Sequence, residues 1–200
     1  MIMKKTLKIS LVIAVVLTAL NVRAVNSELP SNLKTKADDG KKVSFTLEET
    51  KNVQMTIFDS NDDLVFRENI SVNDNKMRTY DLTHFPEGEY YLETESDLKI
   101  SKYKIKVIGN VAHLSSEAVY VVYKPVFVSK DGLVTVKLLN LEETPISVTI
   151  LDSNNNEVYQ NTFKSEISFG KAFRIENIKN SKCTFIVAFA GKTFNSTIIL

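Results

Sequence analysis

The stretch Met55-Thr-Ile-Phe-Asp-Ser-Asn61 recurs as Val148-Thr-Ile-Leu-Asp-Ser-Asn154, at an offset of 93 residues. In both copies apolar and polar residues alternate and then meet a cluster of Asp, Ser and Asn. Alternation with a period of two gives a sheet one buried face, and such a cluster is typical of a hairpin turn. The stretch therefore predicts a strand followed by a turn, and its recurrence predicts that the surrounding unit is duplicated.

The duplication extends outward at the same offset. Val65-Phe66 corresponds to Val158-Tyr159, and Tyr80-Asp-Leu82 corresponds to Phe173-Arg-Ile175. Further pairs at this offset are Tyr90 and Cys183, Leu92 and Phe185, Ile105 and Ile198, and Val107 and Leu200. Two motifs recur with a slip of one residue, namely Leu47-Glu-Glu-Thr50 as Leu141-Glu-Glu-Thr144 and Asp39-Gly40 as Asp131-Gly132. Because inward residues and turn residues recur together, the sequence predicts two copies of one compact core.

Alternating runs elsewhere extend the strand prediction. The residues expected to face inward in three such runs are Val43, Phe45 and Leu47, then Val53, Met55 and Ile57, and then Tyr103, Ile105 and Val107. Turn clusters separate the runs, and no amphipathic helix follows the first 24 residues. Short alternating strands joined by tight turns favour an antiparallel sandwich. The predicted fold class is all-β, with two tandem antiparallel immunoglobulin-like β-sandwiches after an N-terminal signal peptide.

The first 24 residues are organised like a secretion signal. A basic start containing Lys4, Lys5 and Lys8 precedes an apolar run from Ile9 to Leu20, and Ala24 closes a plausible cleavage site. A run this short suits transient insertion and cleavage, and a retained signal anchor is the alternative. We therefore expect residues 1–24 to be removed, leaving a periplasmic, secreted or cell-surface protein without a membrane span.

The expected domains are residues 25–109 and 110–200. The boundary is placed in Gly109-Asn-Val-Ala-His-Leu-Ser-Ser116, which is polar and loses the alternation of its neighbours. The second copy then opens with a run from Ala118 to Val128 that is apolar on both faces. Such a run is either covered on both sides or lies at a contact between domains. Pro125 lacks a backbone donor, which favours an edge or bulge position there.

Charge and cysteine content exclude several classes of function. Without the four basic residues of the signal, 21 basic and 24 acidic residues remain, and this net charge of −3 offers no footprint for nucleic acid. Lys102, Lys104 and Lys106 alternate on one strand face, as either an anionic ligand strip or a solvated face that discourages edge pairing. Cys183, the only cysteine, excludes an intrachain disulfide. Because it shares a face with Phe185, we expect a small buried hydrophobe rather than a reactive thiol.

The stretch Tyr80-Asp-Leu-Thr-His-Phe-Pro-Glu-Gly-Glu-Tyr-Tyr-Leu92 carries a family resemblance. With the hairpin that follows Ile57-Phe58-Asp59, it resembles the immunoglobulin-like modules of small secreted proteins, including the C-terminal sorting domains of the type IX secretion system. The resemblance covers residues 53–107 well and residues 146–200 loosely. It implies a fold and an exported location, but no activity, because sandwiches host many functions.

The turn inside this stretch also has a physical interpretation. Asp81 is expected to accept hydrogen bonds from nearby backbone amides, while Pro86 fixes φ and Gly88 permits a positive φ. Tyr90 is expected to bury its ring and place its hydroxyl on a backbone group, as in a tyrosine corner. These roles are all structural.

Reactive and metal-binding motifs are few. Asp59-x-Asn61-x-Asp63 and Asp152-x-Asn154-x-Asn156 match the opening of a calcium loop, although Asp and Asn also dominate hairpin turns. His84 and His113 each stand alone in a predicted loop, and the common nucleophile, phosphate and zinc motifs are missing. We therefore name no catalytic, cofactor-binding or metal-ligating residue, and we expect a protein that is not an enzyme and needs no cofactor.

Three functions remain open at this stage. The first is a secreted tandem sandwich that binds or scaffolds an envelope protein or a glycan. The second is exported cargo or an accessory subunit of a secretion or surface-assembly system, for which an exposed apolar edge at 119–128 is expected. The third is an enzyme, which needs His84 or His113 near both a carboxylate and a hydroxyl. Phe58 and Phe66 are expected either to pack under the other domain or to form a ligand-contact patch, and no oligomeric state is predicted.

Overall fold

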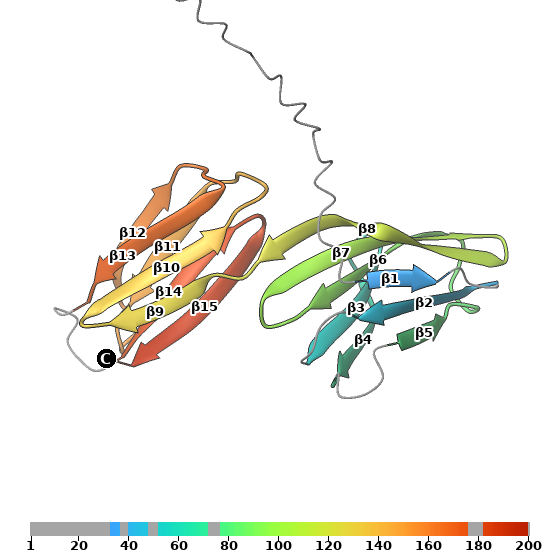
Figure 1. Ribbon diagram of the computed structural model, residues 1–200, viewed down its shortest axis with the longest axis horizontal. Coiled ribbons are helices and arrows are strands. Elements are labelled where there is room, and N and C mark those ends of the chain that lie inside the picture. Colours follow the sequence, from blue (N-terminus) through green and yellow to red (C-terminus); the bar gives the residue numbers. More distant parts are fainter. Residues whose placement is uncertain (1–32, 37–39, 48–51, 72–76, 176–181, 200) are drawn as a thin grey trace, which may run out of the picture.

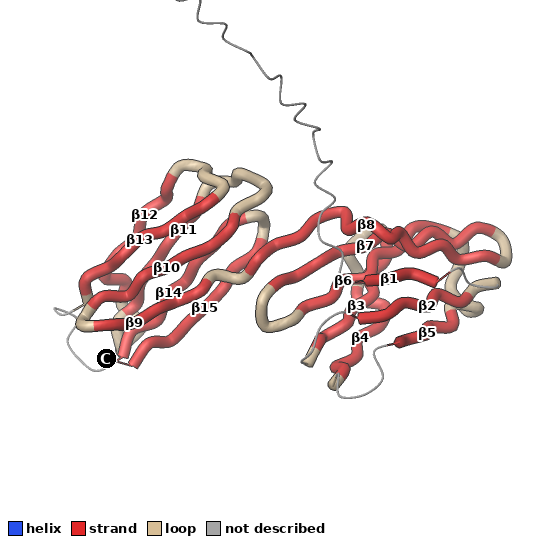
Figure 2. The backbone as a smooth tube through the Cα atoms, in the orientation of Figure 1, coloured by secondary structure: helices blue, strands red, loops and turns tan. Residues whose placement is uncertain are grey.

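The computed structural model describes residues 33–36, 40–47, 52–71, 77–175 and 182–199 (Figure 1). Within these ranges the regular secondary structure consists of β-strands (Figure 2). The predicted signal peptide lies outside the described residues, as do Glu48–Thr50 and Leu200 of the repeat. In the part of the chain that the structure describes, no helix is long and apolar enough to cross a membrane.

The first half of the chain forms a sandwich of two antiparallel sheets. Its strands are β1 (Leu33–Lys36), β2 (Lys42–Leu47), β3 (Val53–Asp59), β4 (Leu64–Ile70), β5 (Met77–Asp81), β6 (Gly88–Glu95), β7 (Lys99–Ile108) and β8 (Val111–Tyr123). One sheet has the order β1-β2-β5, and the other has the order β4-β3-β6-β7-β8. The predicted alternation is confirmed, because the inward residues of β2, β3 and β7 are all buried in one core.

The second half repeats this arrangement. Its strands are β9 (Val126–Lys130), β10 (Leu133–Leu139), β11 (Ile146–Leu151), β12 (Glu157–Phe163), β13 (Ser168–Arg174), β14 (Lys182–Phe189) and β15 (Lys192–Ile199). Their sheets have the orders β9-β10-β13 and β12-β11-β14-β15. Each strand from β9 to β15 thus corresponds to one from β1 to β7. The predicted fold class, two tandem antiparallel immunoglobulin-like sandwiches, is confirmed.

Strand register supports the duplication residue by residue. Leu92 pairs with Tyr103 between β6 and β7, and Phe185 pairs with Ser196 between β14 and β15, at the predicted offset of 93. Cys183 is fully buried in the second core beside Phe185, as expected for a small hydrophobe. Burial also raises the pKa of its thiol, because an apolar environment disfavours the thiolate.

The slipped tetrad is not a structural equivalence. Leu47 is a buried core residue at the end of β2, whereas Leu141 is exposed in the turn after β10. The strand register shows which residue takes the place of Leu47. Val43 pairs with Tyr80 in the first copy, and Val134 pairs with Phe173 in the second, so Val43 corresponds to Val134. Leu47, four residues after Val43, therefore corresponds to Leu138. The second copy accommodates its longer turn around a buried asparagine, Asn140, whose side-chain amide donates to the backbone oxygen of Thr144 at 2.8 Å.

The expected domain boundary at 109/110 is wrong. Gly109 and Asn110 form a tight turn between β7 and β8, and Gly109 has a positive φ of 55°. Strand β8 then pairs with β7 from Val111 to Tyr123, so it belongs to the first sandwich. The alternation breaks because the register between β7 and β8 shifts, and near that shift the Ser115 hydroxyl bonds the backbone of Glu117. A bulge within one strand, and not a boundary between domains, therefore explains the loss of alternation.

The apolar run at 118–128, which follows the bulge, lies at the contact between the sandwiches. This was one of the two alternatives that the sequence predicted for it. Val121 is buried in the first core, and its neighbour Val122 is buried in the second. Successive side chains of a strand point to opposite faces, so one strand serves both cores. Only Lys124 and Pro125 separate β8 from β9, and Figure 1 shows β8 running from one sandwich to the other.

Candidate functional site

The two candidate calcium turns use their aspartates to hold backbone. Oδ1 of Asp59 accepts hydrogen bonds from the amides of Asn61 and Asp63 at 2.8 and 3.0 Å. Oδ1 of Asp152 accepts from Asn154 and Asn156 at 2.8 and 2.9 Å. Among the residues that the structure describes, no cluster of three or more His, Cys, Asp or Glu side chains is suited to a metal ion. The recurrence of these motifs therefore has a structural reason in the turn itself.

The predicted roles in the Tyr80–Leu92 stretch are confirmed. Tyr90 has its ring buried, and its hydroxyl donates to the backbone oxygen of Pro86 at 3.0 Å. Asp81 accepts a hydrogen bond from the amide of Thr83 at 2.9 Å, and Gly88 has a positive φ of 156°. These side chains shape the turn before β6.

Two lysines of the row on β7 form ion pairs. Lys102 bonds Asp62 at 2.9 Å, and Lys104 bonds Glu89 at 2.7 Å. The interpretation that the row protects a sheet edge is wrong, because β8 pairs with the outer side of β7. Since two of its three lysines are already matched by carboxylates, the row is also a poor anionic ligand strip.

The two outward phenylalanines pack within the first sandwich. Phe66 lies edge-to-face with Tyr80 at 5.5 Å between ring centroids, which joins β4 to β5. Phe58 lies beneath the Lys102 ammonium, 5.8 Å from its ring centroid, and Tyr91 lies 4.6 Å from the same ammonium. This cation–aromatic cluster stabilises the outer face of the larger sheet.

The enzyme alternative required His84 or His113 to lie within hydrogen-bond reach of both a carboxylate and a hydroxyl. In the described ranges, no hydrogen bond joins His84 or His113 to a carboxylate or a hydroxyl. Asp81, three residues before His84, accepts hydrogen bonds from the backbone amide and the hydroxyl of Thr83.

A polar contact joins the sandwiches on one side. Glu93 of β6 accepts hydrogen bonds from Tyr120 of β8 and from Lys192 of β15, both at 2.9 Å. The Lys192 ammonium also lies 5.9 Å from the Tyr120 ring centroid. Burial raises the pKa of Tyr120 above its ordinary value, and the nearby Glu93 carboxylate raises it further. The contact therefore keeps Tyr120 a neutral donor and ties β15 to the first sandwich.

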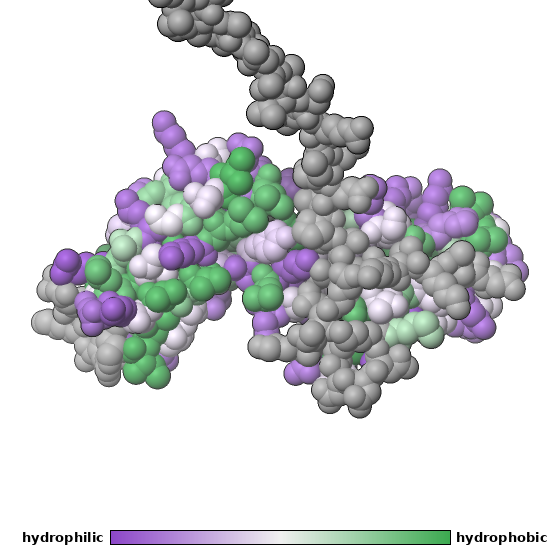
Figure 3. All heavy atoms as spheres, in the orientation of Figure 1, coloured by the Kyte–Doolittle hydropathy of each residue, from purple (hydrophilic) through white to green (hydrophobic). Residues whose placement is uncertain are grey.

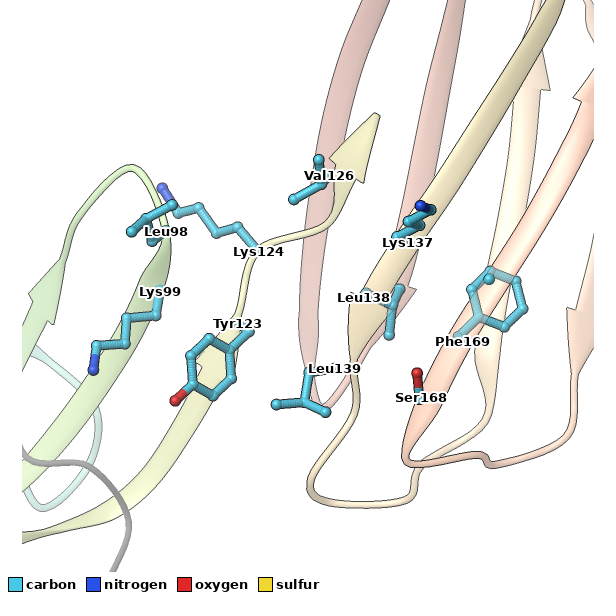
Figure 4. A pocket seen from close by; sticks show the side chains of 11 residues that line it. Leu98, Lys99, Tyr123, Lys124, Val126, Lys137, Leu138, Leu139, Ser168 and Phe169 are labelled. Carbon is cyan, nitrogen blue, oxygen red and sulfur yellow. The ribbon is translucent and has the colours of Figure 1, made fainter. Parts of the chain in front are cut away.

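A groove of about 780 Å³ lies between the sandwiches, beside the β8–β9 connection (Figure 4). Leu98 and Tyr123 line it from the first sandwich, and Leu139 and Phe169 line it from the second. The full lining of this inter-sandwich groove is Leu98, Lys99, Tyr123, Lys124, Val126, Lys137, Leu138, Leu139, Ser168, Phe169 and Gly170. A ligand here would touch both modules at once.

Lysines frame the apolar floor of the inter-sandwich groove. Lys124 bonds Glu95 at 2.8 Å, and Lys99 lies 5.8 Å from the centroid of the Tyr123 ring. Lys137, on β10 of the other sandwich, is exposed. The lining of the groove thus combines apolar side chains with three lysines, Lys99, Lys124 and Lys137.

The groove residues were not predicted from sequence. Leu98 and Leu139 come from a turn and a strand end that are distant in the chain, and exposed single leucines of this kind are common on protein surfaces. One sequence signal did point to the region, namely the run at 118–128 with apolar residues on both faces. It located the contact between the sandwiches without identifying the residues opposite.

Comparison with known families bears out the resemblance for the first sandwich. Residues 38–108 match the family model described as a secretion system C-terminal sorting domain. The match covers most of the first sandwich and ends before β8 and the second sandwich. The matched family is a sorting domain rather than an enzyme, and it points to a secreted or cell-surface protein.

Two solved structures are similar to longer parts of the chain. The BSP domain of a biofilm-associated protein is 16% identical with a TM-score of 0.26, and the alignment covers 84% of this chain and 29% of the chain in that structure. A segment of two fibronectin type-III domains from chicken tenascin is 9% identical with a TM-score of 0.31, over 85% of this chain and 98% of the segment. No curated protein matches the chain.

Proposed function

We propose that this protein is a secreted or cell-surface binding module, not an enzyme, that holds an envelope protein or a glycan in the inter-sandwich groove. The sorting-domain match over residues 38–108 supports export. The duplicated sandwich supports a binding or structural role, since immunoglobulin-like folds present surfaces to partners without needing a catalytic site.

The groove is the observation that carries this proposal. Its volume of about 780 Å³ lies within the usual range for ligand sites, and such sites often occur between domains. Its walls come from β7, β8, β9, β10 and β13, so the bound partner would hold the two modules in one arrangement. The exposed apolar floor residues Leu98 and Leu139 supply surface that a partner would remove from water.

The test is a screen of the full chain against glycans and isolated envelope proteins, followed by groove variants. Leu98→Glu and Leu139→Glu place acidic groups on exposed floor positions, so the fold should tolerate both. We expect each to weaken binding of a hit from the screen by at least about tenfold.

Val158→Glu is the matched control, because Val158 is a similarly exposed apolar residue on β12, outside the groove lining. It should leave binding unchanged. Equal affinities for the Leu139→Glu, Val158→Glu and parent proteins would contradict the assignment of the groove. If Leu98→Glu, Leu139→Glu and Val158→Glu all leave binding unchanged, the partner binds elsewhere on the molecule.

A second candidate function is exported cargo or an accessory subunit of a secretion or surface-assembly system. The sorting-domain match specifically favours it. Cell fractionation separates the two functions. Covalent retention at the cell surface after C-terminal trimming would support cargo, whereas an intact periplasmic species would support the binding module.

A further inference from the structure

A second cavity, of about 790 Å³, lies at one end of the first sandwich. Strands β3, β4 and β6 contribute to it where β3 begins and where β4 and β6 end. We call it the polar pocket, because its lining includes the side chains of Asn52, Gln54, Asn69, Glu95, Asp97 and Lys124. It adjoins the inter-sandwich groove, since Lys124 lines both cavities. Figure 3 shows hydrophilic atoms beside apolar ones where the first sandwich faces the second.

A row of three polar side chains crosses the sheet inside the polar pocket. Gln54 on β3 pairs with Asn69 on β4 and with Glu95 on β6. Residues that pair directly share a sheet face, so two carboxamides and a carboxylate stand side by side. Val53 and Met55, the neighbours of Gln54 along β3, are buried in the core. The row therefore lies on the outer face of the sheet, where a ligand can reach it.

Hydrogen bonds hold the polar groups of the pocket in fixed positions. The side-chain amide of Gln54 donates to Oδ1 of Asn69 at 3.1 Å. The Lys124 ammonium bonds Glu95 at 2.8 Å, and the Lys124 backbone amide donates to the backbone oxygen of Leu98 at 2.8 Å. Each carboxamide carries two donor hydrogens and an acceptor oxygen, so one bond between Gln54 and Asn69 leaves both groups able to bind a ligand.

The second copy shows that the fold does not require these long polar side chains. The residues that correspond to the row at the 93-residue offset are Ser147, Thr162 and Ala188. They pair across β11, β12 and β14 in the same way as the row pairs across β3, β4 and β6. The second copy thus builds the same part of its sheet from short side chains. The two carboxamides and the carboxylate are therefore a property of the first sandwich alone.

The mixture of donors and acceptors determines which ligand chemistry fits the polar pocket. A ligand that displaces water from these groups must replace their hydrogen bonds, because burying an unpaired polar group costs free energy. A hydroxyl group both donates and accepts, so a ligand with several hydroxyls matches carboxamides, a carboxylate and an ammonium together. An anionic ligand would instead meet the carboxylates of Glu95 and Asp97.

We propose that the polar pocket binds a neutral saccharide, whose hydroxyl groups bond the side chains of Gln54, Asn69 and Glu95. The volume of about 790 Å³ lies within the usual range for ligand sites. The pocket is a separate site from the inter-sandwich groove, so this proposal does not depend on the function proposed above.

The binding test titrates the full chain with four neutral oligosaccharides, namely cellohexaose, maltohexaose, mannohexaose and xylohexaose, in a calorimeter. Gln54→Ser and Asn69→Thr give the first copy the residue types that the second copy has at Ser147 and Thr162. Both positions lie on the outer sheet face, so the fold should tolerate the changes. We expect at least one oligosaccharide to bind the parent, and each variant to bind it at least about tenfold more weakly. Failure of all four to bind the parent would overturn the proposal.

Two control variants separate the polar pocket from other surfaces. Gln160→Ser makes the same chemical change at an exposed position of β12, outside the pocket lining, and should bind the oligosaccharide as the parent does. Leu139→Glu alters the inter-sandwich groove and should also leave saccharide binding unchanged. Weaker binding by Leu139→Glu, with parent-like binding by Gln54→Ser, would place the saccharide in the groove. That result would support the function proposed above and overturn the present proposal.

A nuclear magnetic resonance measurement on the parent protein gives an answer even if a variant fails to fold. The side-chain amide signals of Gln54 and Asn69 should shift when the oligosaccharide is added, whereas those of Gln160 and Asn161 on β12 should stay in place. An uncharged glycine–serine peptide serves as a second probe and should shift none of them. Shifts of equal size for all four side chains, no shift for Gln54 and Asn69, or equal shifts with the peptide would overturn the proposal.

Discussion

Tyr90 illustrates how single side chains fix the turns of this protein. Its ring fills the first core next to Phe85, at 5.1 Å between centroids, and its hydroxyl reaches the backbone oxygen of Pro86. The second copy has Cys183 at the corresponding position, so this corner was not duplicated with the strands. Residues of this kind were predictable because proline, glycine and tyrosine lie close together in sequence.

Tyr90→Phe should therefore destabilise the protein modestly. The substitution keeps the buried ring but removes the donor to Pro86, and the expected loss is about 1 kcal/mol of unfolding free energy. Urea unfolding measures it. Tyr91→Phe is the control, because Tyr91 lies on the outer sheet face under Lys102. Equal losses in the two variants would contradict the assigned role of the Tyr90 hydroxyl.

Asp152 should make the free energy of unfolding decrease as the pH falls. The side-chain amide of Asn156 and the backbone amides of Asn156 and Asn154 hold the pKa of Asp152 below its ordinary value. Stability from a lowered carboxyl pKa is present above the unfolded-state value of about 4, and is lost as the pH falls through the folded-state pKa.

The Asp152→Asn protein should accordingly lose less stability than the parent on acidification. Asparagine keeps an acceptor for the two backbone amides but has no charge to titrate. Urea unfolding at about pH 7 and about pH 3 measures the difference. Glu157→Gln, at the exposed first position of β12 just after the same turn, controls for removal of one negative charge. A parent protein and Asp152→Asn protein with the same acid loss would refute this role.

At the scale of elements, β8 is the strand that contributes to both cores. Strands such as β3, β7, β11 and β14 followed from alternation and from the 93-residue repeat, because both record local burial. The identity of β8 did not, because a bulge near Ser115–Glu117 interrupts the alternation within a single long strand. The groove residues were also out of reach, since they meet only when two separate modules pack.

Substitutions at two adjacent positions of β8 should show that this strand contributes buried residues to both cores. Val121→Ala and Val122→Ala each remove buried methyl groups, and each should cost roughly 1–3 kcal/mol. Val119→Ala, at a position with 54% of its surface exposed, should change stability by no more than about 0.5 kcal/mol. Thermal and urea unfolding provide the measurement. Tolerance of Val122→Ala at the level of Val119→Ala would contradict the placement of Val122 in the second core.

For the whole molecule, the arrangement of the sandwiches depends on a short connection and a few side chains. Glu93, Tyr120 and Lys192 join the sandwiches on one side, and the inter-sandwich groove opens beside the β8–β9 connection. A partly exposed ion pair contributes up to about 1 kcal/mol, so its removal should affect orientation more than folding.

Lys192→Ala should therefore broaden the distribution of distances between the sandwiches. Pulsed electron paramagnetic resonance, with one spin label on each sandwich, measures that distribution. Lys137→Ala removes a lysine from the groove rim without touching Glu93, so its distribution should match that of the parent. A parent-like distribution in Lys192→Ala would show that the Glu93 contact does not set the orientation.

The central claim is that two sandwiches fold around separate cores, each with its own set of inward residues. Phe45→Leu perturbs the first core and Phe185→Leu perturbs the second. Amide hydrogen exchange followed along every strand tests the claim most directly. Faster exchange confined to β2–β7 in Phe45→Leu and to β10–β15 in Phe185→Leu is the predicted result, whereas equal acceleration throughout the chain in both variants would contradict it.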